Sequence, residues 1–230
     1  TLKNAFANKD IRKKILLTLL LLVVFRIGCY IPVPGLARGL LENAVTSNDF
    51  LGLMSGVTGG ALANGTLFAL GIGPYINASI IVQLLTVGIP ALERLSKQGE
   101  EGRKKITNIT RIITIVLAVI QAIGIIVNFA GGFQDMASSE DIRWDLFFDL
   151  QWLAIVYMTV IYTAGAMLVM WLGERITEYG VGNGISLIIF VGIISTAGDS
   201  ILKKLVGINA NNIAPLFEVI GFLVLAIVVF

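Results

Sequence analysis

Two side chains that enzymes often use for catalysis, those of histidine and cysteine, are absent from this sequence or occur once. The chain of 230 residues contains no histidine and one cysteine, Cys29. The lack of histidine excludes imidazole bases, Ser/His and Cys/His nucleophile pairs and histidine-ligated metals. A single cysteine cannot form a disulfide within the chain. We therefore expect no enzyme, no metal site and no cofactor.

The charged residues lie mostly between long apolar stretches. We interpret Arg26 as the one deep charge, which fixes the first stretch by snorkelling or by internal pairing. We expect no carboxylate inside a membrane span. Ion-coupled transporters keep such groups in their spans to bind the coupling ion or proton. The absence of such groups argues against a secondary transporter for a small solute with an inverted-repeat fold, which we keep as the alternative interpretation.

Two pairs of isoleucines could perform a different task, the exclusion of ions. Ile72 and Ile76 are four residues apart, as are Ile185 and Ile189, so each pair lies on one face of a predicted helix. Spacing alone favours ordinary packed or lipid-facing surface. The functional interpretation is a narrow ring of branched side chains, which blocks ions by dewetting without any fixed charge.

The composition places these residues in a membrane protein. The chain is 56% hydrophobic and 14% charged, with a mean hydropathy of +0.87. Residues 50–92 hold no charge, yet they exceed the roughly 20 residues of one span. We predict a glycine-broken half-helix over 50–65 and a long apolar helix over 66–92. Lipid cannot satisfy the ends of a half-helix, so surrounding protein must do so, as in channels and transporters.

The predicted fold is an all-α, polytopic helical bundle. Five spans, over 15–35, 66–92, 106–130, 150–172 and 181–201, make one unit at 15–201, and 213–230 begins a sixth. The basic segment 1–14 and the loop 93–105, with five basic and three acidic residues, are expected in the cytoplasm. The acidic loop 131–149 is expected outside and 173–180 is expected to be a tight cytoplasmic turn. Lys203 and Lys204 disagree with this topology.

Four blocks of sequence resemble the SecY/Sec61 family of protein-conducting channels, in its bacterial form. They are TLFALGIGPYINASIIVQLL at 66–85, RIGCYIPVPG at 26–35, GEEGRKKI at 99–106 and GERITEYGVGNGIS at 173–186. The resemblance covers about the first half of such a protein. It implies the first half of an inverted-repeat channel, which moves unfolded polypeptides across the membrane and releases apolar segments sideways into lipid.

The resemblance also assigns roles to individual residues. The pore ring would include Ile72, Ile76, Ile185 and Ile189. The plug, a re-entrant half-helix over 50–65, would include Leu53, Met54, Gly56, Gly60 and Leu62. One side of the lateral gate would include Ile80, Gln83 and Leu84. The cytoplasmic partner face would include Arg94, Lys97, Arg103, Lys104 and Lys105. The stretch Thr58-Gly59-Gly60 departs from the family pattern and leaves the plug boundaries open.

The implied partners follow from the same resemblance. They are the translocating polypeptide with its signal sequence, small membrane subunits of the SecE and SecG type, a SecA-type motor or the ribosome on the cytoplasmic face, and membrane lipid. We expect a multi-pass protein of the cell membrane with a cytoplasmic N-terminus. The other half of the ring and gate would lie in a second half of the protein, beyond Phe230.

Overall fold

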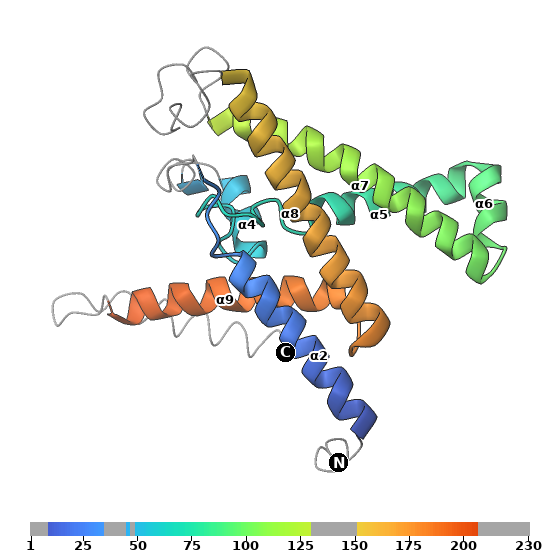
Figure 1. Ribbon diagram of the computed structural model, residues 1–230, viewed down its shortest axis with the longest axis horizontal. Helices are drawn as coiled ribbons and strands as arrows, with labels where there is room; N and C mark the ends of the chain where they lie inside the picture. Colours follow the sequence, from blue (N-terminus) through green and yellow to red (C-terminus); the bar gives the residue numbers. More distant parts are fainter. Residues whose placement is uncertain (1–8, 35–44, 47–48, 130–150, 207–230) are drawn as a thin grey trace.

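The computed structural model describes residues 9–34, 45–46, 49–129 and 151–206, and these residues are almost entirely helical (Figure 1). The named helices are α2 (Lys9–Gly28), α4 (Asp49–Val57), α5 (Gly73–Gly88), α6 (Pro90–Ser96), α7 (Glu100–Phe129), α8 (Gln151–Tyr179) and α9 (Gly184–Val206). The predicted all-α class is confirmed. The predicted sixth span and the acidic loop 131–149 lie outside the described residues.

Three of the described helices are long and apolar enough to cross a membrane. These stretches are Glu100–Val127, Ile155–Tyr179 and Gly184–Leu202, and α5 with α6 makes a fourth if the bent pair is counted as one span. Helix α2 is not among them. It has basic residues at both ends, Arg12, Lys13 and Lys14 at its start and Arg26 near its finish, so its uncharged stretch is short. The number of five spans stays a prediction, and so does the division at 1–14, 15–201 and 213–230.

The prediction of one continuous helix over 66–92 is wrong. Residues 66–72 form turns, and α5 begins only at Gly73, with a proline in its first turn. The helix ends at Gly88, and the chain bends by 106° into α6. Ile89 at the bend is extended (φ −111°, ψ 112°) because it precedes Pro90, whose ring disfavours the helical conformation there. The apolar run therefore contains the helix α5 and, after it, a sharp bend at Ile89 that we call the elbow.

Both predicted cytoplasmic loops are largely helical. In the loop 93–105, α6 and α7 are separated only by a turn at Gly99, which has a φ of +72°. The turn predicted at 173–180 is wrong, because α8 continues through it. The actual turn occupies 180–183, where Gly182 has a φ of +75°. The Asn183 side chain then caps α9 by accepting hydrogen bonds from the backbone N–H groups of Ile185 and Ser186, at 3.0 and 3.4 Å.

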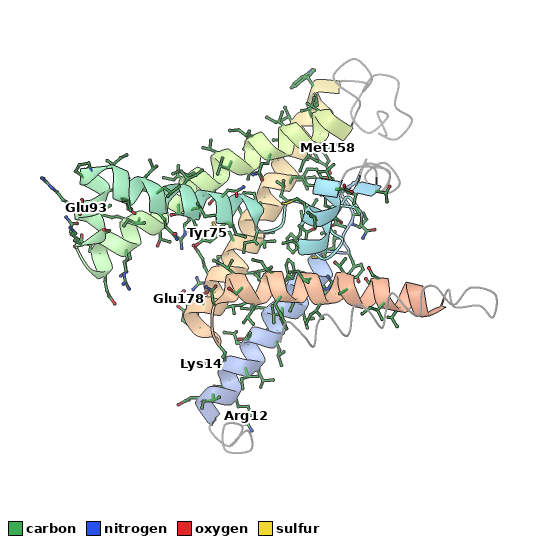
Figure 2. The ribbon with its side chains drawn as sticks, turned by 180° about the vertical axis from the view of Figure 1, so that it is seen from behind. Arg12, Lys14, Tyr75, Glu93, Met158 and Glu178 are labelled. Atoms are coloured by element: carbon green, nitrogen blue, oxygen red, sulfur yellow. The ribbon has the colours of Figure 1, made fainter. Side chains whose placement is uncertain are left out.

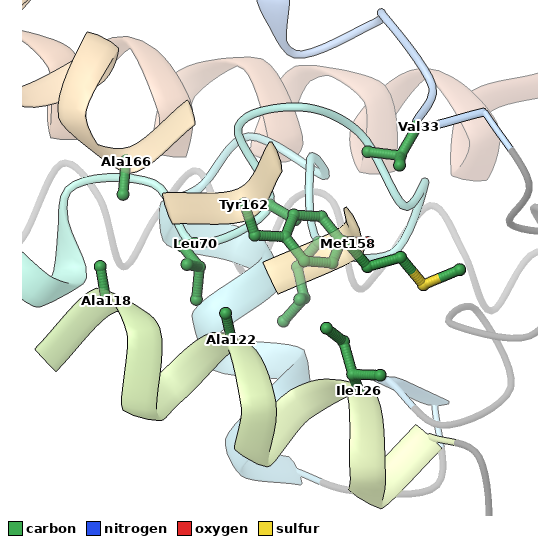
Figure 3. Close-up of a cluster of buried hydrophobic side chains, with 10 residues drawn as sticks. Val33, Leu70, Ala118, Ala122, Ile126, Met158, Tyr162 and Ala166 are labelled. Carbon is green, nitrogen blue, oxygen red and sulfur yellow. The ribbon is translucent and has the colours of Figure 1, made fainter. Parts of the chain in front are cut away.

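Two clusters of buried side chains hold the helices together. The first, called the α7–α8 core, lies between α7, α8 and the turns at 62–70 (Figure 3). Its members are Val33, Leu62, Ala69, Leu70, Ala118, Ala122, Ile126, Met158, Tyr162 and Ala166. Alanines on both helices allow a close approach of their backbones, as is usual between membrane helices.

The second cluster, called the isoleucine core, lies where α2, α5, α8 and α9 meet. Its buried members are Phe25, Cys29, Ala61, Phe68, Ile72, Val169, Leu172, Ile176 and Ile188. The rings of Phe25 and Phe68 stack at a centroid distance of 5.9 Å. Helix α4 lies against α9, close to the point where α2 ends (Figure 1). The plug segment is therefore next to the cluster that contains the predicted ring residues.

Candidate functional site

The four predicted ring isoleucines come together in the isoleucine core, although they belong to two distant parts of the chain. Ile72 is a buried member, at 4% exposure, and Ile76, Ile185 and Ile189 are partly buried against the cluster. Their common position disfavours a lipid-facing surface and is compatible with ordinary packing as well as with a ring. Their role as a pore ring stays a prediction.

The structure adds Ile188 to the four predicted isoleucines, although the four-residue spacing did not single it out. A side chain built on Gly173 of α8 would meet Ile72 Cδ1 at 3.5 Å, Ile185 Cγ1 at 3.4 Å and Ile188 Cδ1 at 3.5 Å. Three branched side chains thus converge on this glycine. Ile188 is 2% exposed, which makes it the most deeply buried isoleucine in the first turns of α9. A pattern of four-residue steps from Ile185 passes over it.

The local sequence explains why Ile72 points inward. Gly71 adopts a left-handed conformation with a φ of +55°, which few side chains tolerate. A Cβ at this position would also meet Thr58 Cγ2 at 2.7 Å. Ile72 then occupies the N-cap of α5, directly before Gly73 and Pro74. The sequence Gly-Ile-Gly-Pro therefore turns the chain sharply and begins α5 with its first isoleucine in the core.

The predicted plug segment contains one short helix and a run of turns. Helix α4 covers Asp49–Val57, and the chain then turns repeatedly up to residue 72. Leu62 is buried in the α7–α8 core and Met54 packs against that core. Leu53 is 72% exposed, so it makes little contact with the rest of the structure. The half-helix was predicted over 50–65, but the helix ends at Val57 and the rest of that range forms turns; its role as a plug stays a prediction.

The stretch Thr58-Gly59-Gly60 ends α4 by a Schellman motif. The Gly60 N–H donates to the Ser55 carbonyl at 2.8 Å, and the Gly59 N–H donates to the Gly56 carbonyl at 3.3 Å. Gly59 takes the left-handed conformation that this motif requires, with a φ of +70°. These residues therefore set the C-terminal boundary of the helix, which the sequence left open.

Arg26 is paired inside the protein. Its Nη1 donates to the Gly59 carbonyl at 3.3 Å and its Nη2 donates to the Tyr30 hydroxyl at 3.0 Å. The guanidinium carbon lies 5.2 Å from the centroid of the Tyr30 ring, which is a cation–π distance. Of the two expected uses of this arginine, internal pairing is the one that the structure contains.

The segment that contains α4 is pinned at its two ends by an isolated β-bridge. The Val33 N–H donates to the Gly65 carbonyl and the Leu67 N–H donates to the Ile31 carbonyl, each at 3.0 Å. Pro32 and Thr66 form the bridge itself. The chain leaves α2 and returns to α5 at the same place. The intervening segment is thus a closed loop, whose ends are held independently of α4.

The predicted gate residues form an exposed strip on α5. Ile80 is 49% exposed and Leu84 is 68% exposed, whereas Ala78 and Val82 on the opposite face are buried. The Gln83 amide, also exposed, donates only to Ser79 Oγ within the same helix, at 3.3 Å. Within the described part of the chain, this apolar strip is left uncovered. Its assignment to a lateral gate stays a prediction.

The predicted cytoplasmic partner face is a compact helical hairpin made by α6 and the start of α7. All five of its basic residues are exposed: Arg94, Lys97, Arg103, Lys104 and Lys105. Lys97 pairs with Glu93 at 2.6 Å and Lys105 pairs with Glu101 at 3.4 Å. Glu93 lies well away from Met158 of the α7–α8 core (Figure 2). The hairpin thus presents its charges apart from both cores.

Two charges inside predicted spans were missed. Arg111 lies in the span predicted at 106–130, and Asp199, which is exposed, lies in the span predicted at 181–201. The expectations that Arg26 is the one deep charge and that no carboxylate falls in a span are therefore wrong. Arg111 binds Glu174 of α8 with two hydrogen bonds, Nε to Oε1 at 3.0 Å and Nη2 to Oε2 at 2.7 Å. A charge inside a span is expected to have a partner, but Glu174 lies just beyond the predicted span 150–172, so the predicted boundaries concealed the pair.

Comparisons with known proteins agree on one family. The SecY family model matches residues 66–230. The protein translocase subunit SecY of Staphylococcus carnosus (strain TM300) is 42% identical over 204 residues, which cover 88% of this chain and 45% of that protein. That of Lactococcus lactis subsp. lactis (strain IL1403) is 44% identical over 217 residues, covering 94% and 47%. The chain spans about half the length of the curated relatives it matches.

Solved structures share the fold at a lower sequence identity. Sec61 in the canine ribosome–channel complex from the endoplasmic reticulum superposes with a TM-score of 0.55 at 20% identity, over 92% of this chain and 45% of that one. A structure described as that of a protein conducting channel gives the same values. At this identity the likeness establishes the fold and leaves the function to other arguments.

Proposed function

Because this chain belongs to the SecY family, we propose that it is part of the central subunit of a protein-conducting channel. The channel translocates unfolded polypeptides across the membrane and inserts apolar segments laterally into it. One observation carries the proposal beyond family membership: isoleucines from α5 and α9 converge in one apolar cluster beside the short helix α4. The protein acts by shape and polarity and has no catalytic step of its own.

The isoleucines suit a constriction that must admit any sequence. Dispersion contacts are individually weak and have no preferred direction, so branched aliphatic side chains yield equally to most polypeptides. A narrow apolar passage also resists ions, because ions lose their hydration there and gain no compensating charge. Ile72, Ile76, Ile185 and Ile189 form the half of this ring that the chain contributes. Ile188 packs in the same buried cluster.

The segment 50–65 acts as the plug. Its helix α4 is short, packs through Leu51 and Met54 against the α7–α8 core and lies against α9, while the bridge at Pro32 and Thr66 retains the loop. A segment held in this way is able to leave its position and return to it. The closed channel thus has two barriers, the apolar ring and the plug.

The exposed strip on α5 supports lateral release. Ile80 and Leu84 offer an apolar edge that a second half of the channel would cover when the gate is closed. Segments that reach an open gate partition by their transfer free energy, which favours Leu and Ile and opposes a central Lys or Asp by roughly 2.5–3.5 kcal/mol. The gate thereby sorts apolar segments into lipid and passes polar ones across.

The α6–α7 hairpin faces the cytoplasm and contributes to the docking of a motor of the SecA type or of a ribosome. Its exposed basic residues would attract RNA phosphates or an acidic protein surface. The structural neighbour Sec61 is described in a ribosome–channel complex. Small membrane subunits of the SecE and SecG type complete the assembly. The protein lies in the plasma membrane with its N-terminus in the cytoplasm, as the basic residues of 1–14 favour.

A secondary transporter finds no support in these observations. It requires a buried titratable group that is free to bind a coupling ion. The missed pair, Arg111 and Glu174, is closed by two hydrogen bonds between its own members. The comparisons point to protein translocases and not to solute transporters.

Site-specific photocrosslinking tests the proposed function. A photoreactive residue is placed at Ile76, in the isoleucine core, and in a second variant at Ile120, which is 60% exposed on α7. In membranes that hold the complete translocase and a stalled secretory chain, we expect an adduct from position 76 and none from position 120. An adduct from neither position, with the stalled chain present, would contradict the proposal.

A further inference from the structure

The carbonyl end of α4 is bound by two other helices. The Schellman motif satisfies the Ser55 carbonyl at 2.8 Å and gives the Gly56 carbonyl one longer bond, at 3.3 Å, whereas the carbonyls of Thr58 and Gly59 accept no backbone hydrogen bond from the described residues. The C-terminus of a helix carries partial negative charge on such carbonyls, and lipid or apolar side chains cannot satisfy them. Here donors from α2 and α9 do so.

Helix α9 supplies a hydroxyl and a close backbone approach. Thr196 Oγ1 lies 3.1 Å from the Gly56 carbonyl and 3.2 Å from the Gly192 carbonyl of its own helix. One hydroxyl proton is therefore shared between a local acceptor and α4. A Cβ on Gly192 would collide with the Val57 carbonyl oxygen, so only glycine lets α9 come this near.

Helix α2 supplies a cation on the other side, and the residue that follows it supplies a thiol. Arg26 Nη1 donates to the Gly59 carbonyl at 3.3 Å, and Cys29 Sγ donates to the Thr58 carbonyl at 3.8 Å. A guanidinium at the negative end of a helix is electrostatically favourable, the more so where water is scarce. The fit is tight, since a Cβ on Gly59 would lie 2.5 Å from Arg26 Nη1.

We propose that Arg26 and Thr196 are positioning residues that form a polar latch for the plug, holding the carbonyl end of α4 between α2 and α9. This inference rests on the proposed function. The bridge at Pro32 and Thr66 keeps the loop attached, whereas the latch decides whether α4 is seated. Because its donors belong to different helices, a separation of α2 from α9 breaks the hydrogen bonds on at least one side of α4. The passage of a polypeptide that moves these helices would thus release the plug.

The first test is the resting ion conductance of the complete translocase in proteoliposomes. Arg26→Met removes the cation with little change in length, and Thr196→Val removes the hydroxyl with no change in shape. Each variant loses one hydrogen bond to α4, so we expect the open fraction at rest to rise about three- to tenfold. Arg26→Lys and Thr196→Ser keep a donor and should restore most of the seal.

Matched controls separate the latch from general effects of the substitutions. Arg175→Met removes an exposed arginine of α8 that contacts Trp171 and Tyr179, and Thr107→Val removes an exposed hydroxyl that bonds only within α7. Both controls should keep the wild-type conductance. Equal conductance in the wild type, Arg26→Met and Thr196→Val would overturn the latch. If Arg26→Met does not reach the membrane, Thr196→Val and its serine partner decide the question alone.

A second measurement does not depend on the channel function. Cys29 is 2% exposed and its thiol donates to the Thr58 carbonyl, so a seated plug protects it. We expect the rate at which a small methanethiosulfonate labels Cys29, mapped by peptide mass, to rise severalfold in the two latch variants and to stay unchanged in the controls. An unchanged rate would overturn the latch even if polypeptide adducts form. Absence of photocrosslinked polypeptide adducts in the wild type would instead overturn the proposed function. The rate of Cys29 labelling would still test the latch in that case.

Discussion

The α7–α8 core and the seat of α4, meaning the contacts of its carbonyl end with Arg26, Cys29 and Thr196, are held together in opposite ways. In the α7–α8 core, Ala118 and Ala122 face buried side chains of α8 over several turns, and Arg111 with Glu174 closes one end. Helix α4 has a single buried side chain among those described, Ser55, and its far end is bound through carbonyl groups. Continuous apolar packing makes a rigid scaffold, whereas a few directional hydrogen bonds make a position that can be left.

The largest effect is expected from Gly165→Val, which attacks the scaffold. A Cβ on Gly165 of α8 would collide with the Leu67 carbonyl oxygen, and this neighbour is backbone that cannot rotate away. We expect a loss of about 3 kcal/mol in the free energy of unfolding. Gly124→Val on α7 is the matched control, because nothing lies within 4 Å of its Cβ position. Thermal unfolding in detergent measures both variants, and similar midpoints would show that α8 and the turn at Leu67 tolerate separation at this point.

A smaller effect on stability, but a large one on permeability, is expected from Ile72→Gly. Removal of this buried side chain leaves a cavity in the isoleucine core and costs about 2 kcal/mol or more. We also expect the resting ion conductance to increase severalfold, because the constriction is wider. Ile80→Gly on the exposed strip of α5 provides the control and should keep the resting ion conductance of the wild type. A sealed membrane with Ile72→Gly would mean that the plug alone closes the channel.

The smallest effect is expected from Glu174→Gln, which tests the polar closure of the scaffold. The side chains of Arg111 and Glu174 are 45% and 20% exposed, so solvent screens part of their attraction. We expect a loss of about 1 kcal/mol in unfolding free energy, with no change in resting conductance. Glu178→Gln, which breaks only an exposed pair with Arg175, should change neither quantity measurably. An increase in conductance with Glu174→Gln would show that scaffold and seat are coupled.

The sequence predicted the helices of the α7–α8 core better than it predicted the contacts of α4. Helices of the scaffold are long and apolar, so composition alone indicated them, although α8 continued through the predicted turn at 173–180. The seat of α4 was missed because its donors and acceptors are backbone carbonyls, a threonine and an arginine whose meeting has no signature in spacing. The elbow at Ile89 was readable in principle, since the following Pro90 disfavours a helical residue before it.

The sequence by itself determined which stretches are helical and apolar, and that Ile72 and Ile76 share a face, because helical periodicity is a local property. It did not determine the turn at Gly71, which was predicted to lie inside a continuous helix over 66–92 and instead has a φ of +55°. Only the tertiary structure decided that Ile188 joins the isoleucine core and that Arg26 reaches the Gly59 carbonyl. Contacts between distant residues depend on how whole helices cross, and that geometry is set by the packing of all their side chains together.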